Sequence, residues 1–102
     1  MNELTNRDQL NEGIVFVELY TDMCNSCKKQ AKITEGLIPS YPNVTFYQCN
    51  STTEIGAQLC EENNLMQAPS MLIYKNGELV DKFSGLTIPM MLQSKLNNAL
   101  GE

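Results

Sequence analysis

The sequence predicts a single α/β domain in which a mixed β-sheet carries helices on both faces. Three observations support this fold class. Two apolar segments, residues 14–19 and 44–49, flank one helical segment in a β-α-β order. An Asn76-Gly77 pair between two apolar runs is a strong hairpin signal. The length of 102 residues fits one domain, over residues 1–102, without length for a second.

The chain is expected to begin with a short irregular segment that leads into the first strand. Thr5 or Asn6 suits the N-cap of a short helix through residues 10–12, and Gly13 suits its end. A few residues of strand are expected before this helix. Residues 14–19, IVFVEL, then form a nearly continuous apolar run, which is typical of a parallel strand that is buried on both faces.

The next segments complete the β-α-β unit and add a helix. Residues 25–38 contain good helix formers and no proline, and they stop at Pro39, which predicts the crossover helix. Residues 44–49, VTFYQC, are rich in β-branched and aromatic residues and predict a second parallel strand, also buried on both faces. Another helix is expected over residues 53–63. Its apolar face consists of Ile55, Leu59 and Cys60.

The remaining sequence predicts a hairpin and a final helix. Residues 71–74 and 78–83 flank the turn sequence KNG, which predicts two antiparallel strands. Thr87 suits the cap of the last helix, and Pro89 suits its first turn. The expected apolar stripe of this helix consists of Met91, Leu92, Leu96 and Leu100. In such a sheet, the turns at the carboxyl ends of the strands carry the chemistry.

Composition excludes several classes of partner. Seven basic residues against twelve acidic ones give a formal charge of -5, which offers no basic surface for nucleic acid or an anionic membrane. The start, MNELTNRDQLNEG, lacks the features of a secretory signal, and no later apolar run is long enough to span a bilayer. We expect a soluble, cytoplasmic monomer. Because cytosolic reductants keep ordinary disulfides open, its four cysteines are expected to be reactive or metal-bound.

The stretch LYTDMCNSCK places Cys24 and Cys27 on the turn between the first strand and the crossover helix. At the helix start, the sulfur of Cys24 meets unpaired backbone N–H groups and the positive end of the helix dipole, and both favour a thiolate. Cys27 lies one turn later on the same side, close enough for a disulfide and less exposed. We therefore predict that Cys24 is the attacking nucleophile and Cys27 the resolving thiol.

Glu18 interrupts the apolar first strand six residues before Cys24. If this strand is central, the carboxyl group is buried, its pKa is raised, and it exchanges a proton with Cys27 through a water molecule. The alternative is a solvated position near the strand end without a role. A buried acid without a role is costly, which favours the functional interpretation.

The stretches VFVELYTDMCNSCK and QAPSMLIYKNGELVDKFSG resemble the thioredoxin family in order and spacing over nearly the whole chain. The resemblance implies a thioredoxin fold and thiol-disulfide exchange with protein disulfides, acting mainly as a reductant, without an organic cofactor or metal. The implied partners are disulfide-containing protein substrates, with ribonucleotide reductase as a candidate, and a flavin-dependent thioredoxin reductase as electron donor.

The resemblance also assigns individual positions. Cys24 and Cys27 stand at the redox positions, and Glu18 stands where thioredoxins have a buried aspartate. Methionines at the site are expected to contact partners, because their flexible side chains suit adaptable surfaces. The expected substrate-binding residues are Met23, in place of the usual tryptophan, Met66, Ala68 and Pro69 with the cis peptide bond that faces the disulfide, and Gly85 in the neighbouring loop.

The sequence departs from the family at the redox site. Asn25 and Ser26 replace the usual Gly-Pro between the cysteines and add hydroxyl and amide groups that can bond a thiolate. Lys32 replaces the family's kinking proline, and residues 44–49 contain no lysine to partner the buried acid. The redox potential is therefore left open.

Two alternatives remain open at this stage. The first is a zinc-binding module in which Cys24, Cys27, Cys49 and Cys60 form a closed four-thiolate site. Against it, Cys49 and Cys60 lack the close spacing of a zinc knuckle, and Cys60 is expected to be a small core residue. The second is an interaction protein that keeps the fold without redox activity. A regulatory disulfide between Cys49 and Cys60 is a further hypothesis.

Overall fold

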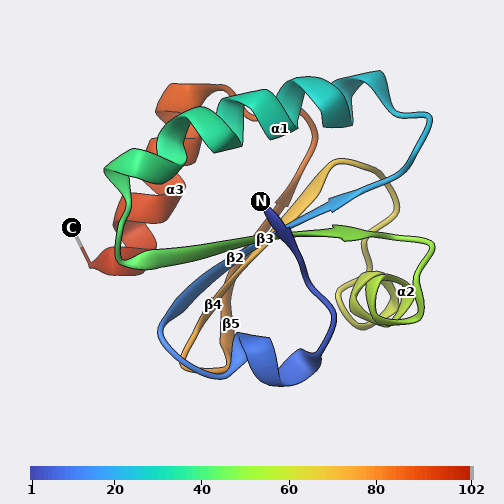
Figure 1. Cartoon of the computed structure of the whole chain (residues 1–102), viewed down its shortest axis with the longest axis horizontal. Coiled ribbons are helices and arrows are strands. Elements are labelled where there is room, and N and C mark those ends of the chain that lie inside the picture. The colour runs from blue at the N-terminus through green and yellow to red at the C-terminus, as the bar shows by residue number, and fades with distance from the viewer. Residues whose placement is uncertain (102) are drawn as a thin grey trace.

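The computed structural model describes residues 1–101 and shows a five-stranded sheet between two layers of helices (Figure 1). The strand order is β1-β3-β2-β4-β5. The first three of these are parallel, and β4 and β5 are each antiparallel to their neighbour. The strands are β1 (Asn2–Glu3), β2 (Ile14–Tyr20), β3 (Val44–Asn50), β4 (Ser70–Lys75) and β5 (Glu78–Ser84).

Three α-helices cover the sheet, α1 and α3 on one face and α2 on the other (Figure 1). Two short 3-10 turns precede β2 and follow α1. The predicted mixed α/β fold with helices on both faces is therefore confirmed. The helical elements are η1 (Arg7–Leu10), α1 (Asn25–Leu37), η2 (Ile38–Ser40), α2 (Glu54–Glu62) and α3 (Pro89–Leu100).

Strand β2 lies at the centre of the sheet, between β3 and β4. All of its residues except the last are buried, as the continuous apolar run predicts. Successive side chains point to opposite faces. Phe16 packs with Leu92 of α3 in one core, whereas Val17 packs with Leu59 of α2 in the other. Glu18, an even-numbered residue like Phe16, therefore belongs to the face that α1 and α3 cover.

The prediction that the second parallel strand is buried on both faces is wrong. In β3, Val44, Phe46 and Cys49 are buried, but Thr45 is exposed and the other residues are half-buried. β3 is incompletely covered for two reasons. Its outer neighbour in the sheet, β1, contributes only two residues. On the face where Cys49 lies, α2 is the α-helix that packs against the sheet, and it covers the Cys49 end of β3.

The hairpin between β4 and β5 follows the prediction. Asn76 and Gly77 have φ values of 51° and 86°, the left-handed backbone that a tight turn between antiparallel strands requires. Helix α2 begins after Thr53, the N-cap residue, whose hydroxyl accepts from the N–H of Gly56 at 3.1 Å. This helix lies so close to the end of β3 that a Cβ atom on Gly56 would overlap the carbonyl oxygen of Asn50.

The start of α3 differs from the prediction. Thr87 does not cap the helix: its hydroxyl donates to the carbonyl oxygen of Gly85 at 3.1 Å, and Ile88 is the N-cap residue without a side-chain bond. Pro89 occupies the first turn as predicted. Met91, expected on the apolar stripe, is 54% exposed. The predicted Leu92 and Leu96 are buried, together with Ala99, and the predicted Leu100 is partly buried against the same core.

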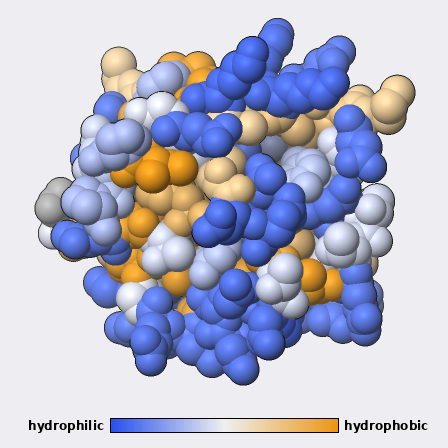
Figure 2. Space-filling model, in the orientation of Figure 1, coloured by the Kyte–Doolittle hydropathy of each residue, from blue (hydrophilic) through white to orange (hydrophobic). Residues whose placement is uncertain are grey.

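Most of the molecular face in Figure 2 is hydrophilic, and its hydrophobic side chains lie in small groups between polar ones. Across residues 1–101, no helix combines the length and apolar character needed to cross a membrane.

Candidate active site

The two cysteines of the CNSC segment lie at the start of α1 and form a disulfide with a Cα–Cα distance of 5.2 Å. Cys24 is the N-cap residue, and its sulfur accepts the backbone N–H of Cys27 at 3.1 Å. The hydroxyl oxygen of Ser26 lies 3.4 Å from the same sulfur. Cys24 is half-buried, whereas Cys27 is only 4% exposed. The outer sulfur is therefore the accessible one, and two polar groups of the turn surround it.

Two loops from the other end of the chain complete this site. The Ala68–Pro69 peptide bond is cis, and the carbonyl oxygen of Ala68 lies 3.7 Å from the sulfur of Cys24. The N–H of Gly85 donates to the carbonyl oxygen of Pro69 at 2.8 Å. Gly85 has a φ of 88°, which favours glycine. The structure thus brings the predicted positions Ala68, Pro69 and Gly85 together beside the disulfide.

A surface groove of about 820 Å³ runs from the disulfide toward α2. Met23 and Met66 lie in its rim and are 96% and 93% exposed, which is unusual for such large apolar side chains. Cys60 is half-buried: it packs against the α2-side core, in line with its prediction, and it also lines this groove. Besides these residues and Cys24, the groove is lined by Thr21, Ser51, Ala57, Glu61, Asn64, Leu65, Gln67 and Ala68.

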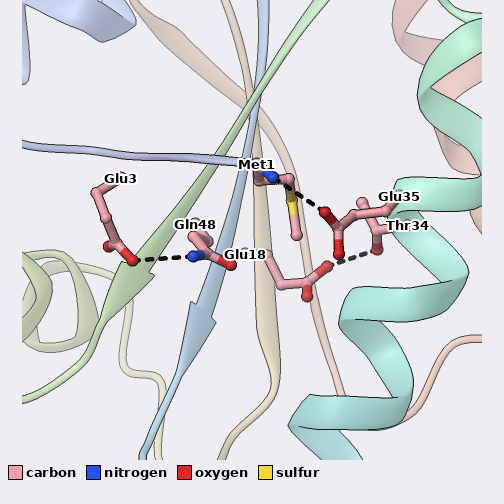
Figure 3. A network of polar contacts seen from close by, with 6 residues as sticks. All are labelled: Met1, Glu3, Glu18, Thr34, Glu35 and Gln48. Carbon is pink, nitrogen blue, oxygen red and sulfur yellow. Dashed lines mark hydrogen bonds and ion pairs between the residues drawn. The ribbon is translucent and has the colours of Figure 1, made fainter.

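Glu18 is buried below the disulfide, with 2% of its surface exposed. Burial raises the pKa of its carboxyl group from 4.5 to about 7, and the hydroxyl of Thr34, which donates to it at 2.5 Å, opposes this rise. The negative charge of Glu35 raises the same pKa further. Figure 3 shows Glu18 beside Thr34, with Glu35 paired to the ammonium group of Met1 at 3.2 Å.

The carboxyl group and the inner cysteine share one hollow. Glu18 and Cys27 both line a cavity of about 210 Å³ at the end of β2, together with Asp22 and Lys28. A space of this size holds several water molecules, and its mostly apolar lining includes the polar side chains of Glu18, Asp22 and Gln48. Glu18, whose pKa burial raises to about 7, therefore lines the same hollow as Cys27, and the hollow has room for water between the two side chains.

With this geometry in view, comparison with known proteins decides the family. The sequence profile described as Thioredoxin matches residues 2–98. The chain belongs to the thioredoxin family. Thioredoxin-1 of Saccharomyces cerevisiae is 30% identical over 88 residues, which cover 86% of this chain and 84% of that protein. The chain is thus a thioredoxin-family oxidoreductase whose CxxC pair can form a disulfide.

Solved thioredoxin structures confirm the thioredoxin fold. Mitochondrial thioredoxin 3 of Saccharomyces cerevisiae, in its oxidised form, matches with a TM-score of 0.83 and 23% identity, covering 96% of this chain and 94% of that one. Thioredoxin of Trypanosoma brucei brucei matches with a TM-score of 0.80 and 20% identity, covering 94% of this chain and 83% of that one.

Two buried polar residues of this thioredoxin-family chain were not predicted from the sequence. Gln30 and Thr34 on α1 are fully buried, and Thr34 contacts Glu18. Their signal is helical spacing: they lie three and seven residues after Cys27, on the same face as Leu37. Polar side chains in the stripe that faces the sheet indicate a buried hydrogen-bonding role.

The four cysteines are not arranged as a zinc site. Cys24 and Cys27 are joined to each other, and Cys49 is 1% exposed within the α2-side core. Burial raises the pKa of the Cys49 thiol, which disfavours the thiolate that zinc binds. In residues 1–101, no three Cys, His, Asp or Glu side chains cluster closely enough to hold one metal ion. The Cys49 and Cys60 thiols are free in this structure.

Proposed function

We propose that this thioredoxin-family chain is a cytoplasmic protein-disulfide reductase that works as a monomer. The observation that carries the proposal is the unequal environment of the two sulfurs. The sulfur of Cys24 is accessible and accepts an N–H of the first helical turn, whereas Cys27 is buried next to the hollow that holds Glu18. A nucleophile in front of a protected resolving thiol suits thiol-disulfide exchange.

The proposed cycle transfers two electrons to the substrate. The Cys24 thiolate attacks one sulfur of a substrate disulfide, and the other substrate sulfur leaves as a thiolate that takes a proton from solvent. Cys27 then loses its proton to Glu18 or to water, and its thiolate attacks the Cys24 sulfur of the mixed disulfide. This step releases the second substrate thiol and leaves a Cys24–Cys27 disulfide, the state that the structure contains.

We propose that a thioredoxin reductase regenerates the dithiol form. The proposed substrates are protein disulfides, and the disulfide of ribonucleotide reductase is one candidate. Family membership supports both partners. The groove beside Cys24, with the exposed Met23 and Met66 at its rim, supports a protein substrate, because flexible methionines adapt to different partner surfaces.

Reduction of insulin disulfides by the dithiol form tests the proposal directly. The parent chain should reduce insulin repeatedly in the presence of a chemical reductant, and Cys24→Ser should abolish this activity. Cys27→Ser should stop after the first attack and accumulate a mixed disulfide that mass spectrometry detects. Absence of turnover in the correctly folded parent would contradict the reductase and favour a binding role for the fold.

The equilibrium potential against glutathione tests the direction of electron flow. A reductase of this family is expected to have a strongly reducing potential of roughly −270 mV, the value of a typical thioredoxin. A much more oxidising value, about −120 mV, would assign the chain to disulfide formation instead. Asn25→Gly/Ser26→Pro is the informative companion variant, because Ser26 places a hydroxyl 3.4 Å from the Cys24 sulfur.

A further inference from the structure

A chain of buried polar groups connects the acid below the disulfide with the loop beside it. It begins at Glu18 on β2, continues through Thr34 and Gln30 on α1, and ends at the backbone of Thr87. The side chains of Thr34 and Gln30 are fully buried, and Glu18 and Thr87 are buried as well. None of these groups is part of the CNSC segment.

The hydrogen bonds in this chain have a fixed direction. The backbone N–H of Thr87 donates to the side-chain oxygen of Gln30 at 2.6 Å. This bond identifies which side-chain atom of Gln30 is the oxygen, and the other atom is therefore the amide nitrogen, a donor. That nitrogen donates to the carbonyl oxygen of Thr87 at 3.1 Å and to the hydroxyl oxygen of Thr34 at 3.5 Å. The Thr34 hydroxyl has a single proton, which it donates to Glu18 while its oxygen accepts from Gln30.

We propose that Thr34 is a positioning residue for the resolving step, which holds Glu18 as a carboxylate toward the hollow shared with Cys27, and that Gln30 ties this arrangement to the loop at Gly85. This inference rests on the proposed function and names residues of the same site. A donor that points at a buried carboxyl group favours its charged form, and only the charged form accepts the proton of Cys27.

The other groups around Glu18 do not replace this donor. Gln48 of β3 and Met71 of β4 are its strand neighbours, and the side-chain nitrogen of Gln48 donates to Glu3 at 2.9 Å instead (Figure 3). On α1, Glu35 opposes the carboxylate. The remaining charged or titratable groups near Glu18 are the Met1 ammonium group, which favours the carboxylate, and the hollow-lining Tyr20, Asp22, Cys27 and Lys28.

The same network anchors the loop that faces the disulfide. Gln30 holds both polar backbone groups of Thr87, and two residues earlier the N–H of Gly85 donates to the carbonyl oxygen of Pro69. Helix α1, which begins at the CNSC segment, is therefore tied to the predicted substrate-binding loop through the side chain of Gln30. A substrate that displaces this loop also disturbs the donor that orients Thr34.

Thr34→Val tests the proposal because it removes the hydroxyl and keeps the volume of the side chain. The Glu18 carboxyl group, followed by carbon-13 NMR, should titrate about one pH unit higher in this variant, which lowers the carboxylate fraction at pH 7 from about one half to about one tenth. The rate at which Cys27 resolves a preformed mixed disulfide should shift to higher pH by the same amount. Thr34→Ser, which keeps the donor, should restore both midpoints.

Gln30→Met provides a second variant that retains Thr34, and it should shift both midpoints in the same direction by less than Thr34→Val. In a Glu18→Gln background, Thr34→Val should leave the pH dependence of resolution unchanged. Unchanged midpoints in Thr34→Val and Gln30→Met would overturn the inference while an active parent still supports the reductase. A parent that reduces no disulfide would overturn the proposed function itself, whatever Glu18 does in the titration.

Discussion

The sulfur of Cys24 lies 3.1 Å from the backbone nitrogen of Cys27, at the position where an N-cap side chain accepts one of the free N–H groups of the first helical turn. Serine, threonine, aspartate and asparagine fill this position in most helices. A cysteine fills it best as an anion, because a thiolate accepts a hydrogen bond from an N–H much more strongly than a thiol does. The capping of α1 and the reactivity of Cys24 therefore depend on the same contact.

Alkylation of the reduced protein by iodoacetamide should show this effect. The rate at Cys24 is expected to reach half its maximum clearly below pH 8.5, the approximate value for free cysteine, because the helix start stabilises the thiolate. Cys60, half-buried in the last turn of α2, is an internal reference in the same sample. Mass spectrometry separates the two sites. Equal pH profiles at Cys24 and Cys60 would contradict the proposed nucleophile.

Glu18→Gln should stabilise the protein at alkaline pH and leave its stability unchanged at acid pH. The folded protein binds more protons than the unfolded chain between pH 4.5 and about 7, because burial raises the Glu18 pKa across this interval. The free energy of unfolding therefore falls as pH rises through this window. The rise in the Glu18 pKa corresponds to a loss of about 3 kcal/mol in the free energy of unfolding. The Glu18→Gln variant should recover this stability above pH 8.

Urea unfolding at pH 4 and at pH 8.5 measures this difference. Glu12→Gln is a suitable control, because Glu12 is exposed before β2 and is not among the charges that act on Glu18, so it should give little difference between the two pH values. An equal effect of Glu18→Gln at both pH values would mean that the buried carboxyl group does not titrate as assigned.

Gly56→Ala should destabilise the protein by about 3 kcal/mol, since the added Cβ overlaps the carbonyl oxygen of Asn50 and forces α2 away from β3. Gly36→Ala is the matched control, also in a helix, with no atom within 4 Å of the added Cβ. It should stabilise the protein by about 0.5 to 1 kcal/mol, because alanine is the better helix former. Thermal unfolding of both variants decides whether the close approach exists.

Met23→Ala and Met66→Ala should weaken substrate binding without changing stability. Both side chains are almost fully exposed at the rim of the groove, so their removal should alter the free energy of unfolding by less than about 0.5 kcal/mol. The KM for insulin should rise several-fold while kcat stays close to that of the parent. Met90→Ala, 74% exposed on α3 outside this groove, is the control and should leave KM unchanged.

The strands and their order follow from short-range patterns in the sequence. The unbroken apolar run of β2 predicts burial on both faces, and the Asn76-Gly77 pair predicts the antiparallel hairpin, because each pattern has few alternative structures. The burial of β3 was not predictable in this way. Its composition resembles that of β2, but its exposure depends on how many residues of another segment pair with its outer edge.

The site divides in a similar way. Cys24 and Cys27 are predictable because the chemistry depends on their spacing within one helical turn. Thr87 is a reasonable N-cap by residue type, but Gln30 binds its backbone from 57 residues away and holds it before the helix begins. Such a contact has no local signature. The helical spacing from Cys27 to Leu37 indicates that Gln30 is buried, but it does not indicate that Thr87 is its partner.

The central position of β2 also determines how this chain must fold. Ile14 pairs with Val44 on one side and with Lys75 on the other, so the strand gains its second neighbour only after most of the chain has been made. Pairings between such distant segments require closure of long loops, which costs conformational entropy before any contact compensates for it. Folding is therefore expected to be slow for a domain of this size. A fragment that ends before Ser70 would expose one open edge of β2, a surface on which other chains aggregate.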